Sequence, residues 1–89
     1  MKNMAMSDET LRLLALMART PGSVACIAGG SGRLAGVFRH GNVVETFPTT
    51  QLDEMRRTGY LTEGGCRRGH HKLRWKKWAE HVKKAQESL

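Results

Sequence analysis

Three short apolar runs separated by glycine-containing turns constrain the fold of this chain more than any other feature. The runs cover residues 24–28, 33–39 and 43–47, and turns at 29–32 and 40–42 separate them. Runs rich in β-branched and apolar residues that end at glycines are typical of strands. Because such short turns only allow hairpin connections, the sequence predicts a three-stranded antiparallel meander.

Helices are predicted on both sides of this meander. Ser7 is placed to cap a first helix, whose apolar run at 11–18 ends at a Thr-Pro-Gly stop. Thr50 is expected to cap a second helix that continues to residue 58 and ends at Gly59. Apolar residues spaced by three and four predict a third helix over 76–89. Its apolar stripe is expected to face the core or, in a homodimer, a second copy, and comprises Trp75, Trp78, Val82, Ala85 and Leu89.

A β-hairpin is predicted between the second and third helices. Its strands, 60–63 and 70–75, flank a loop at 64–69 that begins and ends with glycine and carries two arginines. The predicted fold class is therefore α+β, in the order helix, three-stranded meander, helix, β-hairpin, helix. A chain of 89 residues is expected to form a single domain, with residues 1–6 flexible.

Positive charge is concentrated in the last part of the chain. The formal net charge is +7; residues 1–65 hold seven Lys and Arg against six Asp and Glu, and residues 66–89 hold eight against two. Clustered cations attract nucleic acid and release its counterions. We therefore expect nucleic-acid binding, with duplex DNA as the partner. The candidate contacts are the arginines and lysines of the second helix, the hairpin and the following turn: Arg56, Arg57, Arg67, Arg68, Lys72, Arg74, Lys76 and Lys77.

The second helix and the arginine-tipped hairpin together resemble the recognition helix and wing of winged-helix DNA-binding domains. The resemblance implies phosphate contacts by the wing and a role in regulating transcription. A meander stands where those domains have the helix that braces the recognition helix.

The element order is also similar to that of the small YjhX-like family of bacterial toxins. Shared features are the Leu- and Ala-rich first helix, Ser31-Gly32-Arg33 in the first turn, Arg39 before a glycine turn, the Thr49-Thr50 helix entry and the lysine-rich end. This resemblance implies a toxin of a toxin–antitoxin pair as an alternative function. Another alternative is an inhibitor of the anti-CRISPR type, encoded by a phage or mobile element, that binds a host protein or nucleoprotein complex.

Catalytic and metal-dependent functions are not expected. Cys66, His70 and His71 are close in sequence, and Cys26 and His81 complete a conceivable set, but zinc sites have paired ligands at short spacings. A Cys66 nucleophile would lack an oxyanion hole and an orienting third group. We therefore expect no enzymatic activity, no metal and no cofactor. Cys26, within an apolar run, is predicted to be a reduced core thiol.

No membrane association is expected from the sequence. No apolar run approaches the roughly 20 residues that span a bilayer. The first residues, MKNMAMSDET, lack the apolar region of a secretory signal. We therefore expect a cytoplasmic protein.

Overall fold

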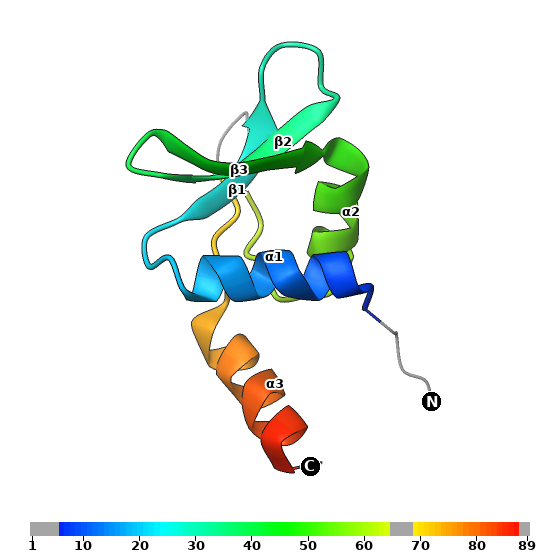
Figure 1. Cartoon of the computed structure of the whole chain (residues 1–89), viewed down its shortest axis with the longest axis vertical. Helices are drawn as coiled ribbons and strands as arrows, with labels where there is room; N and C mark the ends of the chain where they lie inside the picture. The colour runs from blue at the N-terminus through cyan, green and yellow to red at the C-terminus, as the bar shows by residue number, and fades with distance from the viewer. Residues whose placement is uncertain (1–5, 65–68, 88–89) are drawn as a thin grey trace.

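The structure is a computed structural model that describes residues 6–64 and 69–87. In chain order the elements are α1 (Asp8–Ala18), β1 (Val24–Ala28), β2 (Leu34–Arg39), β3 (Asn42–Pro48), α2 (Thr49–Arg57) and α3 (Trp75–Glu87). The predicted α+β class and the order helix, meander, helix, helix are confirmed. Figure 1 shows the sheet on one side of α1 and α3 on the other.

The sheet is an antiparallel meander with the strand order β1-β2-β3. The register places Cys26 opposite Gly36 and Gly36 opposite Thr46. It shifts after Val37, which pairs with Glu45, whereas Phe38 pairs with Val43. The shift marks a β-bulge in β3.

The hydrophobic core lies between one face of the sheet and the helices. Ala25, Ala35 and Val37 are fully buried on this face, because alternate strand residues point to the same side. Cys26 is buried as a thiol and not in a disulfide, as predicted, but it lies outside the core cluster, on the opposite face. The core cluster comprises Leu13, Leu14, Met17, Ala25, Ala35, Val37, Phe47, Leu52, Met55, Leu61, Leu73 and Trp78.

Ser7 caps α1 as predicted, and its neighbour Thr10 joins α1 to α2. The Ser7 hydroxyl accepts a hydrogen bond from the Thr10 amide at 3.2 Å. Thr10 is fully buried, and its hydroxyl accepts a hydrogen bond from the Gln51 side chain of α2. The predicted cap of α2 is wrong: Pro48, not Thr50, occupies the N-cap position and makes no side-chain cap.

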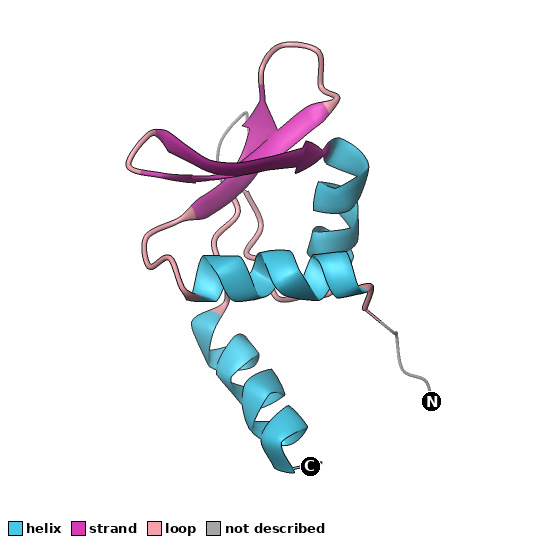
Figure 2. Cartoon of the chain, in the orientation of Figure 1, coloured by secondary structure: helices cyan, strands magenta, loops and turns pink. Residues whose placement is uncertain are grey.

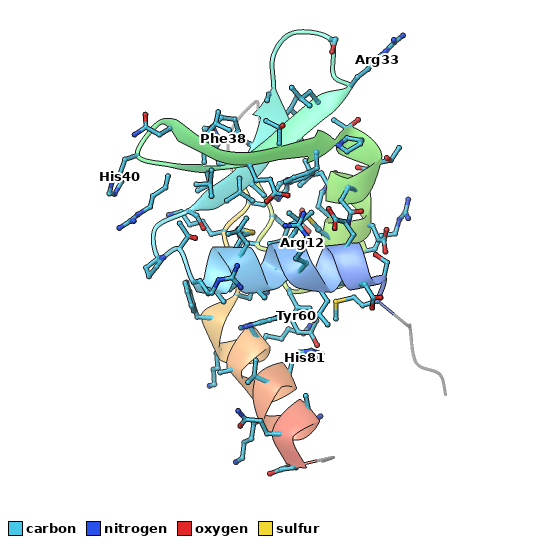
Figure 3. The ribbon with its side chains drawn as sticks, in the orientation of Figure 1. Arg12, Arg33, Phe38, His40, Tyr60 and His81 are labelled. Carbon is cyan, nitrogen blue, oxygen red and sulfur yellow. The ribbon has the colours of Figure 1, made fainter. Side chains whose placement is uncertain are left out.

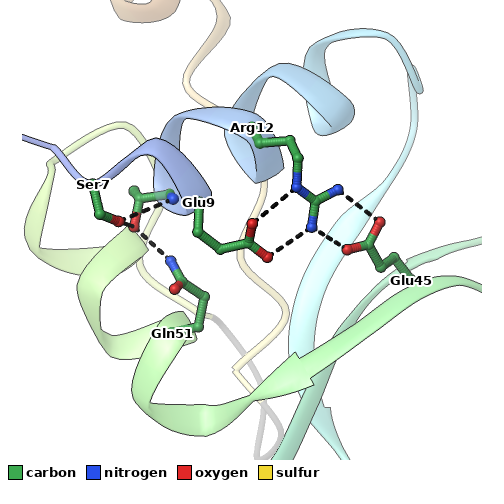
Figure 4. A network of polar contacts seen from close by, with 6 residues as sticks. Ser7, Glu9, Arg12, Glu45 and Gln51 are labelled. Carbon is green, nitrogen blue, oxygen red and sulfur yellow. Dashed lines mark hydrogen bonds and ion pairs between the residues drawn. The ribbon is translucent and has the colours of Figure 1, made fainter.

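Arg12 connects α1 to β3 through two carboxylates (Figure 4). Its Nε and one terminal nitrogen donate to Glu9 at 2.9 and 2.7 Å, and the other terminal nitrogen donates to Glu45 at 3.0 Å. A further contact joins Arg12 and Glu45. These hydrogen bonds from the guanidinium hold the pKa of both Glu9 and Glu45 below the ordinary glutamate value.

The predicted wing hairpin is wrong for the part of the chain that the structure describes. Residues 60–63 and 70–74 pair at a single bridge, between Leu61 and Leu73, where the Thr62 amide donates to the Lys72 carbonyl oxygen at 2.8 Å and the Arg74 amide donates to the Tyr60 carbonyl oxygen at 2.7 Å. His71 forms a second isolated bridge, with Ala25, so the described part of this region contains no regular pair of strands. Figure 2 shows this region as loops. The predicted tip, residues 65–68, lies outside the described residues.

His71 explains why a regular hairpin does not form. Its backbone N–H and carbonyl both bond Ala25 of β1, each at 2.8 Å. Its Nδ1 lies 2.7 Å from the carbonyl oxygen of Thr62; since a carbonyl only accepts, Nδ1 carries the proton. The amide of Lys72 then donates to the Thr62 hydroxyl at 2.9 Å instead of to the carbonyl. In the described part of the segment, His71 therefore pairs with the edge of β1.

Gly36 offers a direct test of the sheet packing. A Cβ at this position would lie 2.8 Å from the carbonyl oxygen of Glu45, and a backbone atom in a paired strand has little room to move. We expect Gly36→Ala to lower the free energy of unfolding by about 1–3 kcal/mol, measured by urea denaturation. Gly30→Ala is the control, because a Cβ on Gly30 would meet no atom within 4 Å; it should range from no effect to about 1 kcal/mol of stabilisation. Equal effects of the two substitutions would contradict the packing described here.

The Arg12 contacts predict a pH dependence of stability. Glu9 and Glu45 have lowered pKa values in the folded protein. As the pH falls through the glutamate range near about 4.3, the unfolded chain therefore binds more protons than the folded protein does. Stability present above that range is therefore lost as the pH falls. Arg12→Ala should flatten the decline in melting temperature between about pH 5 and pH 3. An unchanged profile in the variant would show that these carboxylates do not carry the effect.

Candidate nucleic-acid interface

An aromatic cluster attaches α3 to the rest of the domain. Trp78 is 7% exposed and packs edge-on against Tyr60, with ring centroids 5.5 Å apart. His81 stacks on Trp78 at 5.0 Å, and its Nδ1 lies 3.0 Å from the Tyr60 hydroxyl. Figure 3 shows Tyr60 and His81 side by side. The cluster holds the first turns of α3 against the segment that follows α2.

The rest of α3 is more exposed than its apolar spacing predicts. Trp78 is buried and Val82 packs against the core, as expected. Trp75 is 49% exposed and Ala85 is exposed, so the prediction that they belong to a core-facing stripe is wrong. The spacing identified the helix correctly but did not show how little of it would contact the domain.

Lys72 and Arg74 lie on the outward side of the segment that leads into α3. Their side chains are exposed, whereas His71 and Leu73, which alternate with them, are buried. The Nε of Arg74 donates to the carbonyl oxygen of Leu61 at 3.0 Å. This bond fixes the base of the guanidinium while the side chain remains exposed.

A hollow of about 380 Å³ lies where α3 begins. We call it the α3 basic hollow; it is lined by Arg74, Trp75, Lys76, Lys77 and Glu80. Three cations therefore face one carboxylate around an indole that is half exposed. The first turn of α3 contains no acidic residue, so the partial positive charge of the helix N-terminus adds to the same field.

Lys77 also reaches back over the end of α2. Its Nζ lies 6.0 Å from the centroid of the Tyr60 ring. A Cβ on Gly59 would lie 3.0 Å from the same nitrogen, and Gly59 has φ +81°, as its predicted role at the helix C-terminus requires. The position of Lys77 thus depends on the turn that ends α2.

The two arginines of α2 occupy a separate hollow. Arg56 and Arg57 are exposed and line a space of about 310 Å³ together with Asp53 and Glu63. Arg56 lies 3.8 Å from the Asp53 carboxylate. The two positive charges of Arg56 and Arg57 are offset here by the two carboxylates. Both arginines lie in the last turn of α2, where positive charge also stabilises the helix dipole. Five of the predicted contact residues are therefore divided between two hollows of different charge: Arg56 and Arg57 in one, and Arg74, Lys76 and Lys77 in the other. Lys72 lines neither hollow.

The remaining predicted contacts, Arg67 and Arg68, lie outside the described residues, as does Cys66. Within residues 6–64 and 69–87, no three His, Cys, Asp or Glu side chains are grouped as a metal site requires. His71 uses Nδ1 to bond the Thr62 carbonyl, which gives it a structural role that the sequence analysis missed. Its position beside a second histidine, shortly after a glycine, carries no signal for that role.

Comparison with protein-family models, curated proteins and solved structures finds no match. The interpretation of this chain therefore rests on its own residues. No helix within the described ranges has the length and apolar character needed to cross a bilayer.

Proposed function

We propose that this protein binds nucleic acid through the α3 basic hollow, with duplex DNA as the partner and regulation of transcription as the use. The observation that carries the proposal is the surplus of positive charge in this hollow. Arg74, Lys76 and Lys77 face only Glu80, whereas the hollow beside α2 is balanced. A surplus of cations on a concave surface raises the local concentration of a polyanion.

Each cationic side chain of the hollow is suited to a particular contact with the nucleic acid. The Arg74 guanidinium is anchored at Nε, so its terminal nitrogens are oriented to donate two parallel hydrogen bonds to a phosphate. Lys76 and Lys77 act as point charges on neighbouring phosphates. These contacts carry no sequence information and set the position of the protein on the nucleic acid.

Trp75 adds an aromatic surface beside the cations. Its side chain is 49% exposed, although an indole of this size is usually more buried. An exposed aromatic ring among cations suits apolar contact with a sugar of the duplex backbone. The separate hollow at Arg56 and Arg57 is expected to contribute less, because Asp53 and Glu63 offset its charge.

The salt dependence of binding to a duplex tests this function. We expect the logarithm of the association constant to fall linearly with the logarithm of the salt concentration, as measured by fluorescence anisotropy. Lys76→Ala combined with Lys77→Ala should reduce the slope by about 2, because each phosphate contact contributes about 0.9. Arg19→Ala combined with Arg39→Ala removes the same formal charge outside the hollow and should change the slope by less than about 1.

Two results would contradict the proposal. One is the absence of binding at low salt. The other is an equal reduction of the slope by both double variants, which would assign the binding to net charge alone and not to the α3 basic hollow.

A further inference from the structure

Helix α3 extends away from the rest of the domain and is exposed over most of its length. Within its 13 residues, Trp78 is buried, His81 and Val82 are partly buried, and the others are exposed. Figure 1 shows α3 leading away from α1 and the sheet toward the C-terminus. At 1.5 Å per residue, the helix is about 20 Å long. Most of its side chains are therefore accessible to a partner.

The exposed side of α3 carries four lysines in two rows. Lys76 and Lys83 are seven residues apart, and so are Lys77 and Lys84. Residues seven apart lie on the same side of a helix, about two turns from each other. All four side chains are exposed. The two rows begin at the α3 basic hollow, which Lys76 and Lys77 line, and continue along the helix.

Glu80 lies at the centre of these four lysines. It is three or four residues from each of them, and residues at those spacings are neighbours on a helix surface. It is two residues from the buried Trp78, so the two side chains point to opposite sides of the helix. The ion pairs of the described residues are made by Arg12 and Arg56, and none of them includes Glu80. We call the four lysines and Glu80 the lysine face of α3.

A carboxylate between two rows of cations fits a groove better than a flat surface. A flat anionic surface, such as a lipid bilayer, would place negative charge against Glu80 as well as against the lysines. In the major groove of a duplex the phosphates lie at the two rims, and the floor presents base edges. The groove is about 12 Å wide, and a helix with its side chains is about 10–12 Å wide. The lysine face therefore matches a major groove in both width and charge.

The chemistry of Glu80 determines which base edge it can contact. An ionised carboxylate only accepts hydrogen bonds. The donors in the major groove are the amino groups of cytosine and adenine. The adenine amino group lies between two acceptors, its own N7 and the thymine O4, and both repel a carboxylate. The cytosine amino group has an acceptor on one side only, the guanine O6, and is the better partner.

We infer that α3 enters the major groove with Glu80 directed at the base edges, where its carboxylate accepts a hydrogen bond from a cytosine amino group. The two rows of lysines contact the phosphates of the two strands, and Trp75 lies at the rim where the helix begins. This inference rests on the proposed function and adds a specificity-determining residue to it. The cations of the site hold the duplex, and Glu80 distinguishes G·C from A·T pairs.

The affinity for two duplexes of different composition tests this inference. The probes are two labelled hairpin duplexes of equal length, one of alternating G·C pairs and one of alternating A·T pairs. Both are measured by fluorescence anisotropy at one salt concentration. The wild-type protein should bind the G·C duplex about fivefold or more tightly than the A·T duplex.

Two substitutions of Glu80 should change this preference in different ways. Glu80→Ala should bring the two affinities to within about twofold of each other, because the contact that discriminates is lost. Glu80→Gln should shift the preference toward the A·T duplex, because a glutamine side chain can bond both N6 and N7 of adenine. Glu80 is exposed, and Ala and Gln are good helix formers, so both variants are expected to fold, which circular dichroism verifies.

Glu63→Ala is the matched control. It removes the same charge from an exposed residue of the other hollow, beside α2, and should leave the ratio of the two affinities unchanged. The inference is overturned if the wild-type protein binds both duplexes equally, or if Glu80→Ala raises both affinities and leaves their ratio unchanged. In either case the proposed function stands. If the protein binds neither duplex at low salt, the proposed function itself fails.

Discussion

The two backbone hydrogen bonds between Ala25 and His71 determine how the last third of the chain is attached to the sheet. They extend the antiparallel pairing beyond β1, at an edge that would otherwise be open. The imidazole of His71, only 5% exposed, bonds the carbonyl of Thr62 and so joins the segment after α2 to the same edge. One buried residue thus links three segments, and Lys72 and Arg74 follow it directly on the way into α3.

This attachment explains how a basic chain separates its charges. Because His71 and Leu73 point inward, Lys72 and Arg74 point outward, and the chain enters α3 with Lys76 and Lys77 on its first turn. Five of the eight acidic residues lie on α1, on α2 and in the segment after α2. Arg12 pairs with Glu9 of α1 and Glu45 of β3, and Arg56 pairs with Asp53 of α2. The molecule therefore presents a cationic surface at the start of α3.

The sequence predicted the local elements more completely than the contacts between them. Glycine turns and runs of apolar and β-branched residues identified the three strands to within one residue at each end, because both signals are local. The wing was predicted wrongly because the pairing of residues 60–74 depends on which carbonyl the His71 ring bonds. The spacing of residues in the sequence does not predict that the His71 ring bonds the Thr62 carbonyl. Trp75 was misplaced for a similar reason: a three-and-four spacing shows that a helix is amphipathic, not how far along its length it touches the domain. The sequence named Arg56 and Arg57 as candidate contacts, but it did not show that the fold places the carboxylates of Asp53 and Glu63 beside them.

Amide hydrogen exchange of Ala25 and His71 tests the central claim most directly. If these two residues pair along β1, both amides should be protected to a degree similar to the amides of β2, such as Val37, because opening them requires disruption of the sheet. If the segment instead projects as a free wing, the His71 amide should exchange as fast as that of the exposed turn residue Gly30. Fast exchange at His71 with slow exchange at Val37 would contradict the attachment from which the outward positions of Lys72 and Arg74 follow.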